Sequence, residues 1–335
     1  MNAGPEERVY EALCGKDRIW IGHYNATAVQ FTPHSINGYY DAGRGHASKS
    51  FTDPLTGRRL LWSWIESPVV ANGANTSGVL MDGYMSVPRE VTWDNVTQQL
   101  LINPVAEVTK LRRRQLTPSA AGSAVASTGT GTGIGSGGIE VVLRGEGTGV
   151  NVPGCSEAGD ALDIIANFTL PPAAQNTKPV DGSTSGSIGG EEEEGVNLIN
   201  VSFGVRFRVG VGAQPQFAEA RFNLTRSSSA GDGSATMAVS PAEGSAKLVP
   251  VTLVRDEALT QQVFSMRLLV DRPVVEVYAQ YGRLRMSVPM RLPISNGRNS
   301  SGYGAGVQVF GPAGASAEVS VWQMGSAFAA APPHL

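Results

Sequence analysis

Few residues in this sequence have both the type and the spacing that catalytic chemistry requires. The run Glu191–Glu194 lacks flanking ligands, which is typical of a solvated loop tip and not of a metal site. Gly133–Gly138 matches a dinucleotide-binding fingerprint in its letters, but it follows a linker and opens a strand, whereas the fingerprint needs a strand before it and a helix after it.

Cys14 and Cys155 lie too far apart in sequence to reveal a disulfide framework, so a buried free thiol is the simplest expectation for each. The histidines show no paired metal-ligand spacing, and we predict no metal site. They are His23, His34, His46 and His334.

Acceptor sequences for N-glycosylation occur more often than chance allows. Seven of the fifteen asparagines are followed by X-Ser/Thr, and because Ser and Thr make up 50 of 335 residues, chance would give about two. The excess indicates a secretory history, although the polar and acidic N-terminus is not a signal peptide. The acceptors are Asn25, Asn75, Asn95, Asn167, Asn200, Asn223 and Asn299.

The chain must be built mainly of strands. It has 41 glycines, 20 prolines and only 16% charged residues, and short apolar runs bounded by Gly, Pro, Asn and Asp recur along it. Several runs alternate as a half-buried strand does: Leu284, Met286 and Val288 share one face, and the polar residues between them share the other. No stretch sustains a helical period, so the predicted fold class is all-β. The net charge of −3 argues against a nucleic-acid partner, and no stretch is long and apolar enough for a membrane helix.

Two low-complexity stretches interrupt the strands. Thr117–Gly138 is rich in Ser, Thr, Gly and Ala, which is typical of a flexible linker or a long loop. Pro171–Glu194 mixes Pro, Gly and Ser before it ends in the glutamate run. The first stretch divides the chain near residue 115 into a shorter and a longer β module. Arg112–Arg114, at the end of the shorter module, is expected to be a solvated charge run.

Three blocks of the shorter module together resemble a known family. They are Ala47-Ser48-Lys49-Ser50-Phe51, Arg58-Arg59-Leu60-Leu61-Trp62-Ser63-Trp64 and Ser86-Val87-Pro88-Arg89. In this order and spacing they resemble glycoside hydrolase family 32, which comprises invertases, inulinases, levanases and fructan exohydrolases. In the longer module, the run from Leu268 to Tyr278 resembles the strand pair near the end of that family's C-terminal β-sandwich.

The resemblance implies a five-bladed β-propeller followed by a β-sandwich. On this basis residues 1–112 are the late blades of a partial propeller, residues 113–138 a Ser/Thr/Gly-rich linker and residues 139–326 the β-sandwich, with a low-complexity loop at 171–195. The implied ligands are sucrose or a fructan, with no metal ion or organic cofactor. The family resemblance and the excess of acceptor sequences both imply an extracellular or vacuolar protein.

The family's retaining mechanism depends on acids that this sequence does not contain. It uses a carboxylate nucleophile and a carboxylic acid that protonates the leaving oxygen, and a third acid holds fructose hydroxyls. These acids lie in Asn-Asp-Pro, Arg-Asp-Pro and Glu-Cys motifs, none of which occurs here. Asp53-Pro54 follows Thr52, so it is no substitute. We therefore expect no catalytic residue in this chain and no sucrose hydrolysis by the chain alone.

Three interpretations fit this pattern. The chain is the C-terminal part of a β-fructofuranosidase whose N-terminal half is missing from the sequence. Alternatively, it is a degenerate relative that survives as a non-catalytic carbohydrate-binding or interaction protein. In the third interpretation, a separately encoded N-terminal half completes the propeller.

The resemblance also singles out residues near the family's substrate pocket. Lys16 lies close to the position of a substrate-contacting lysine, and Asp41 matches an acid at the pocket rim, so both are predicted sugar contacts. Asp41 would serve equally well as the cap of a turn, because Asp beside Gly suits that role. Trp62 and Trp64 share one face of a strand, where core packing is favoured over sugar stacking. Asp271 and Glu276 belong to the sandwich motif and are expected to be structural.

Overall fold

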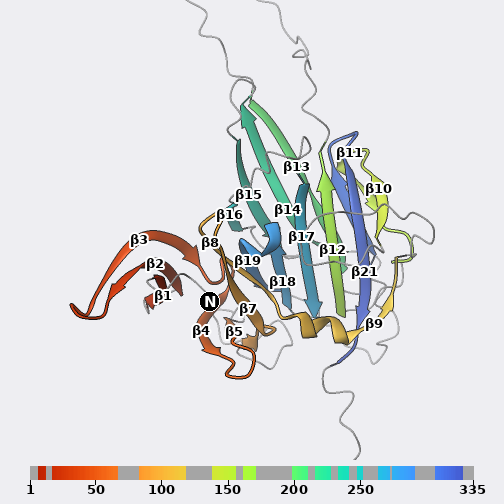
Figure 1. Ribbon diagram of the computed structural model, residues 1–335. Coiled ribbons are helices and arrows are strands. Elements are labelled where there is room, and N and C mark those ends of the chain that lie inside the picture. Colours follow the sequence, from red (N-terminus) through yellow and green to blue (C-terminus); the bar gives the residue numbers. More distant parts are fainter. Residues whose placement is uncertain are drawn as a thin grey trace, which may run out of the picture.

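The computed structural model confirms the all-β class: in the residues it describes, the elements are strands and two short 3-10 helices, η1 (Ala106–Leu111) and η2 (Gln280–Gly282) (Figure 1). The described strands form four antiparallel sheets, two small ones before residue 105 and two large ones after residue 111. Across the described residues, no helix has the length and apolar character needed to cross a membrane. The structure describes residues 7–12, 17–66, 83–117, 138–155, 161–170, 198–209, 216–227, 233–240, 247–251, 263–271, 274–290 and 306–326.

The two small sheets pack against each other. The first has the order β1-β2-β3 and the second the order β4-β5-β7-β8, with β6 paired to β5. Ile19 and Ile21 of the first sheet share a hydrophobic cluster with Leu61 and Ile102 of the second. The strands are β1 (Glu7–Ala12), β2 (Arg18–Asn25), β3 (Gln30–Tyr39), β4 (Gly45–Thr52), β5 (Arg59–Glu66), β6 (Gly83–Met85), β7 (Arg89–Asp94) and β8 (Gln99–Pro104).

Three hairpins of the small sheets use the same kind of turn. In the β2–β3 turn, the side-chain oxygen of Asn25 accepts backbone N–H groups of the next residues, and Asp53 and Asp94 do the same in the β4–β5 and β7–β8 turns. The residue four positions after each cap has a positive φ: Val29, Gly57 and Gln98. A side chain that hydrogen-bonds the backbone two residues on is the usual Asx turn.

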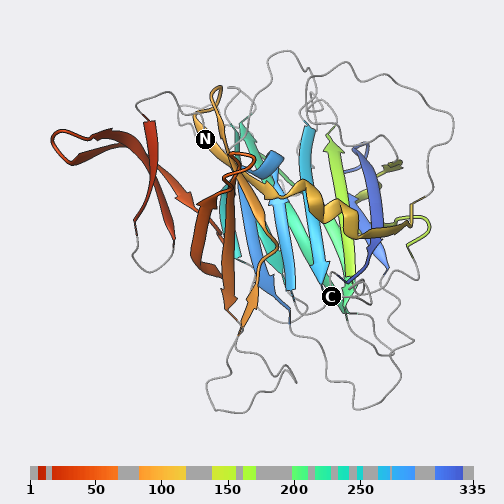
Figure 2. The same ribbon diagram turned by 60° about the horizontal axis from the view of Figure 1, so that its bottom comes forward.

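The two large sheets face each other across one hydrophobic core. Phenylalanines from both sheets meet at its centre, with the rings of Phe203 and Phe264 5.0 Å apart and those of Phe203 and Phe222 5.3 Å apart. Strands of the two sheets that are distant in sequence thereby become neighbours (Figure 2). Burial of large apolar side chains on both inner faces is the main favourable contribution to such a two-layer fold.

The large sheets differ in which strands they contain. The seven-stranded sheet has the order β10-β21-β12-β17-β18-β19, with β9 also paired to β21, and the six-stranded sheet has the order β11-β20-β13-β14-β15-β16. The first sheet comprises β9 (Arg112–Gln115), β10 (Ile139–Val142), β12 (Ala161–Thr169), β17 (Val263–Asp271), β18 (Val274–Ala279), β19 (Leu284–Pro289) and β21 (Ser316–Met324). The second comprises β11 (Gly145–Asn151), β13 (Leu198–Val209), β14 (Gln216–Ser227), β15 (Gly233–Ser240), β16 (Lys247–Val251) and β20 (Val307–Gly311).

The first residues of the linker expected at 113–138 lie in a strand. Residues 112–115 form β9, which pairs with β21 beyond the segment of β21 that β10 occupies. Pairing satisfies backbone groups that the β21 edge would otherwise leave open, and the Arg112 guanidinium carbon lies 3.7 Å from the Trp322 ring centroid. The rest of the expected linker, residues 118–137, and the expected low-complexity loop at 171–195 lie outside the described residues.

The burial of one face of β19 and of one face of β5 also differs from the sequence-based expectation. In β19 the polar residues Arg285 and Ser287 are as buried as the apolar ones, because the second small sheet and its connecting segments cover this face. In β5 the buried face holds Leu61, Ser63 and Ile65, so Trp62 and Trp64 lie on the other face. Trp64 is 39% exposed. The expectation that both tryptophans pack into the core is therefore wrong.

Candidate functional site

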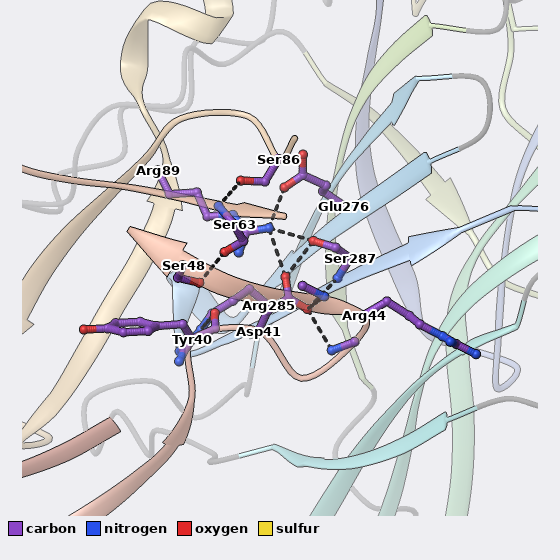
Figure 3. Close-up of polar contacts among 12 residues, drawn as sticks. Tyr40, Asp41, Arg44, Ser48, Ser63, Ser86, Arg89, Glu276, Arg285 and Ser287 are labelled. Atoms are coloured by element: carbon purple, nitrogen blue, oxygen red, sulfur yellow. Dashed lines mark hydrogen bonds and ion pairs between the residues drawn. The ribbon is translucent and has the colours of Figure 1, made fainter. Parts of the chain in front are cut away.

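A group of buried charged side chains lies where the second small sheet meets the seven-stranded sheet (Figure 3). We call Asp41, Arg89, Glu276, Tyr278 and Ser287 the interface cluster. Asp41 comes from the segment between β3 and β4, and Arg89 opens β7. Glu276 and Tyr278 lie on β18, and Ser287 lies on β19. Every contact that Asp41 or Arg89 makes with these three residues therefore joins segments that are far apart in sequence.

Arg89 is the centre of the interface cluster. Its side chain is completely buried, and its Nη2 donates to Asp41 Oδ2 at 3.0 Å and to Glu276 Oε2 at 2.6 Å. The same nitrogen lies 2.6 Å from Ser287 Oγ, and Nε donates to Tyr278 Oη at 2.9 Å. Only Nη1 finds no hydrogen-bond partner among the described residues. Two carboxylates around one guanidinium provide the pairing that a buried charge requires.

Asp41 has every carboxylate position filled by protein. Oδ1 accepts the backbone N–H groups of Gly43 at 2.8 Å and Ser287 at 2.9 Å. Oδ2 accepts the Ser287 hydroxyl at 2.6 Å and the Arg89 guanidinium. The contact to Gly43, two residues on, is an Asx turn, and it gives Asp41 the turn-capping role left open by the sequence. With its side chain buried, Asp41 presents no oxygen to solvent.

Glu276 on β18 holds the second small sheet through a backbone contact as well as through Arg89. Its Oε1 accepts the Val87 N–H at 2.7 Å, and its Oε2 accepts the Tyr278 hydroxyl at 2.7 Å as well as Arg89. Val87 and Arg89 belong to the Ser-Val-Pro-Arg block, so one carboxylate holds two residues of that block. The structural role expected for Glu276 fits these contacts, which reach across the contact between the sheets.

The segment after β3 covers the outer edge of β19. The Ala42 N–H donates to the Arg285 carbonyl at 2.9 Å, and the Arg44 N–H donates to the Ser287 carbonyl at 2.8 Å. Gly43 lies so close to β19 that a Cβ at this position would meet the Ser287 carbonyl oxygen at 2.3 Å. A covered strand edge cannot pair with another chain, and only glycine permits this approach.

Electrostatics hold the cluster in its charged form. Burial alone would raise the pKa of Asp41, but the Arg89 guanidinium and the hydrogen bonds from Ser287 and Gly43 outweigh burial and lower this pKa below its ordinary value. Burial also acts to lower the pKa of Arg89, yet Tyr278, Glu276 and Asp41 raise it above its ordinary value. Burial and the neighbouring Glu276 raise the pKa of Tyr278, which therefore stays a neutral donor.

A row of buried serines extends from the cluster along the second small sheet. The Ser48 N–H donates to Asp17 Oδ2, the hydroxyls of Ser48 and Ser63 lie 2.7 Å apart, and the Ser63 N–H donates to Ser86 Oγ at 3.0 Å. Each serine is almost fully buried. Three of the family-like blocks thus meet in one hydrogen-bonded layer, which explains why small hydroxyl residues occupy these positions.

The arrangement positions segments and offers no reacting group. Its carboxylates and its tyrosine are buried and hydrogen-bonded, and among the described residues no group of three or more His, Cys, Asp or Glu side chains could hold a metal ion. The interface cluster therefore fixes the segment 41–45 and the Ser-Val-Pro-Arg block against β18 and β19. The chemistry it supplies is charge pairing.

The other predicted residues are distributed over the chain. Lys16, Cys14, Asn75 and Asn299 lie outside the described residues, so a sugar contact by Lys16 stays a prediction. Cys155 is the buried free thiol that we expected, and burial raises its pKa to about 12. The remaining acceptor asparagines occupy two kinds of place: Asn25 and Asn95 lie at hairpin turns, whereas Asn167, Asn200 and Asn223 lie within strands.

The sequence places Arg89 in the Ser-Val-Pro-Arg block, but it does not predict the central position of this residue in the interface cluster. The available signal was its position directly after Pro88 at the start of an apolar strand, where an arginine needs a partner if it is buried. The partners lie 187 residues away in Glu276 and 198 residues away in Ser287, so no local pattern could reveal them.

Comparison with known families confirms the resemblance drawn from the sequence blocks. The model of the glycosyl hydrolases family 32 N-terminal domain matches residues 6–104, the part that forms both small sheets and contains Asp41 and Arg89. The chain therefore resembles glycoside hydrolase family 32 in its first module by sequence.

Curated relatives extend the likeness beyond this module. A vacuolar acid β-fructofuranosidase 4 from Arabidopsis thaliana is 31% identical over 303 residues, which cover 86% of this chain and 40% of that protein. An acid β-fructofuranosidase from Phaseolus vulgaris is 27% identical over 336 residues, or 93% of this chain and 45% of that protein. An insoluble β-fructofuranosidase isoenzyme from Arabidopsis thaliana is 34% identical over 109 residues, or 30% of this chain and 18% of that protein. The chain spans less than half the length of these relatives.

Solved structures share the fold of nearly the whole chain. Fructan 1-exohydrolase IIa from Cichorium intybus aligns with a TM-score of 0.62 and 20% identity over 93% of this chain and 55% of that chain. A variant of the same enzyme, solved in complex with 1-kestose, aligns with a TM-score of 0.61 and 21% identity. At these identities the likeness establishes a shared fold.

Proposed function

We propose that this chain is the C-terminal portion of a β-fructofuranosidase-type glycoside hydrolase, whose reaction is the retaining hydrolysis of terminal β-fructosyl bonds in sucrose or fructans. The observation that carries the proposal is the single alignment of 303 residues with the vacuolar acid β-fructofuranosidase, 31% identical. Because that alignment covers 86% of this chain, it runs from the small sheets into the large ones. Relatives named as insoluble and vacuolar isoenzymes support an extracellular or vacuolar location.

In this proposal the two small sheets are late blades of a β-propeller and the two large sheets are a β-sandwich. The Asx turns of the β2–β3 and β7–β8 hairpins support repeated blades, because Asn25 and Asp94 cap corresponding turns with a positive φ four residues later. The shared core of the large sheets supports a sandwich. The interface cluster then fixes the propeller part against the sandwich.

The proposed chemistry needs two carboxyl groups about 5 Å apart, one as nucleophile and one as general acid. The Asn-Asp-Pro, Arg-Asp-Pro and Glu-Cys motifs that hold the family's acids do not occur in these 335 residues. We propose that the chain as it stands releases no fructose and that a propeller half bearing these motifs, in the same polypeptide, completes the site. Lys16 remains a proposed sugar contact. For Asp41, the filled carboxylate supports a role in positioning the rim segment.

The test compares the chain with a version extended to contain the three acid motifs. Each protein is incubated with sucrose, inulin and levan, and released fructose is measured together with its anomeric configuration. We expect hydrolysis with retention by the extended protein and none by the 335-residue chain. Fructose release by the chain itself, abolished by substitution of an acid within it, would overturn the proposal.

A non-catalytic carbohydrate-binding protein is the alternative, and one observation favours it. Phe51 and Trp64 lie on the outward face of β4 and β5 with 43% and 39% of their surface exposed, and the rings of Phe51 and Trp62 stack 5.5 Å apart. Exposed rings of this kind suit stacking against sugar. Retardation of the chain in gels that contain inulin or levan, lost in Trp64→Ala, would favour this alternative, and unchanged mobility would count against it.

A further inference from the structure

We propose that Asn25 and Asn95 carry N-linked glycans in the folded protein and that Asn223, which has the same acceptor sequence, does not. The inference rests on the proposed secretory location and goes beyond it, because it separates acceptor sequences that the amino-acid sequence alone treats as equal. In the transfer, Asn Nδ2 forms a bond to the anomeric carbon of a lipid-linked oligosaccharide diphosphate. The bond from that carbon to the diphosphate oxygen breaks, and a proton leaves Nδ2.

Because transfer takes place on a chain that is still folding, the native structure decides whether the modified chain can fold. A glycan is tolerated where the asparagine side chain reaches solvent and where Nδ2 makes no bond that the fold requires. It is not tolerated where the amide is enclosed by neighbouring strands, since a buried polar group that loses its partner costs about 1–3 kcal/mol. Three of the described acceptors are compared by this criterion.

Asn25 meets the criterion at the tip of the β2–β3 hairpin, which projects from the rest of the molecule (Figure 2). Its side chain is exposed, and Oδ1 accepts the N–H groups of Thr27 and Ala28, both at 3.0 Å. The turn thus uses the oxygen of the amide, which a glycan on Nδ2 leaves in place. Modification of Asn25 therefore preserves the Asx cap.

Asn95 meets the criterion for a tolerated glycan in the corresponding turn of the β7–β8 hairpin. Here Asp94 is the cap: its Oδ1 accepts the Val96 N–H at 3.0 Å, and its Oδ2 accepts the Thr97 hydroxyl at 2.5 Å. Asn95 is exposed, and its backbone carbonyl accepts Gln98 Nε2 at 2.8 Å. The side-chain amide has no part in these turn contacts, so a glycan disturbs none of them.

Asn223 fails the criterion. It lies in the middle of β14, between β13 and β15, and is only partly exposed. Its Oδ1 accepts the Ser202 hydroxyl at 2.9 Å, and its Nδ2 donates to Thr236 Oγ1 at 3.5 Å. The side chain lies on the outer face of the sheet, since Phe222 and Leu224 beside it are buried, and a glycan on Nδ2 would disrupt its contacts with the side chains of both neighbouring strands. Chains modified at Asn223 are expected not to reach the native fold.

The experiment directs the full chain into the secretory pathway of a eukaryotic host with a fused signal peptide. The recovered chain is treated with an amidase that converts each glycosylated asparagine to aspartate in heavy-oxygen water, and peptides are analysed by mass spectrometry. Thr27→Ala removes the first acceptor sequence and keeps the Asn25 cap, and Asn95→Gln removes the second. Thr225→Ala, which removes the acceptor sequence of Asn223, is the matched control.

We expect label at Asn25 and Asn95 and none at Asn223. Each of Thr27→Ala and Asn95→Gln should increase electrophoretic mobility by one glycan step, and Thr225→Ala should leave it unchanged. Absence of label at either Asn25 or Asn95, or label at Asn223 in folded chain, would overturn the inference. Because the signal peptide supplies the route, this result is independent of the fructose-release test of the proposed function.

Discussion

Replacing Arg89 with methionine should strongly destabilise the protein. The change keeps most of the apolar stem of the side chain and removes the guanidinium. Asp41 and Glu276 would then be left as buried carboxylates without their shared cation, with side chains that are 0% and 6% exposed. Asp41 would keep the hydrogen bond from the Ser287 hydroxyl, and Glu276 would keep the one from the Tyr278 hydroxyl. Both donors are neutral.

The contacts set the expected size of the effect. Removing one partner of a buried ion pair costs about 3–5 kcal/mol, because the remaining charge stays desolvated. The retained hydrogen bonds favour the lower end, so we expect Arg89→Met to lower the free energy of unfolding by about 3 kcal/mol. Adding Glu276→Gln should restore part of this loss, since one uncompensated charge disappears. Residues in direct contact commonly couple by about 0.5–3 kcal/mol.

The assay is urea unfolding followed by tryptophan fluorescence and circular dichroism for the wild type, both single variants and the double variant. The matched control is Arg44→Met, because Arg44 pairs with Glu66 at 3.5 Å on the surface and both side chains are about half exposed. Such exposed pairs contribute about 0–1 kcal/mol. A loss below about 1 kcal/mol for Arg89→Met, or strict additivity with Glu276→Gln, would refute the reasoning.

Three further predictions concern single residues. Gly43→Ala should destabilise by about 1–3 kcal/mol in urea unfolding, because the added Cβ meets the β19 backbone, and an unchanged midpoint would show that the segment moves freely. Arg89 and hydrogen bonds lower the pKa of Asp41 in the folded protein below its ordinary value of 3.8, so ionised Asp41 contributes its full stabilisation above about pH 4 and loses it as the pH falls through the folded pKa. When the free energy of unfolding is measured at decreasing pH, Arg89→Met should therefore lose less stability than the wild type. In a Cys14→Ser variant, Cys155 is the remaining thiol, and because burial raises its pKa to about 12, it should react with a disulfide reagent at pH 8 only after the protein is unfolded. Rapid reaction in the native variant would contradict the burial of Cys155.

Much of the strand content could be predicted from local patterns. Alternation of Met266, Leu268 and Val270 marks β17, and all three are buried in the core of the large sheets. The same pattern gave the wrong environment for β19, where Arg285 and Ser287 are buried as well. Periodicity reports which side chains share a face, and it does not report whether a second layer covers the polar face.

The strands of the first module were less visible as patterns. β4 reads Gly-His-Ala-Ser-Lys-Ser-Phe-Thr and has no apolar alternation, because its inward-facing Ser48 bonds to Ser63 and its outward side holds Lys49 and Phe51. Only the resemblance to family 32 identifies this segment in the sequence. Its buried polar layer depends on partners from other strands, which a single segment cannot predict.

The candidate site was only partly predictable for the same reason. The sequence predicts Asp41 as a rim acid or turn cap and Glu276 as a structural acid, without a link between them. Arg89, 48 residues from Asp41 and 187 from Glu276, brings them together. Side-chain pairs at such separations follow from the docking of the two modules, and one sequence gives no measure of that docking.

The most direct test of the proposed function is the sequence of the transcript upstream of the Met1 codon. We predict an in-frame extension that encodes the Asn-Asp-Pro, Arg-Asp-Pro and Glu-Cys motifs, and so supplies the acids of a retaining glycosidase. An in-frame stop codon and a transcript start directly before Met1 would contradict the proposal that these residues continue a catalytic propeller in one polypeptide.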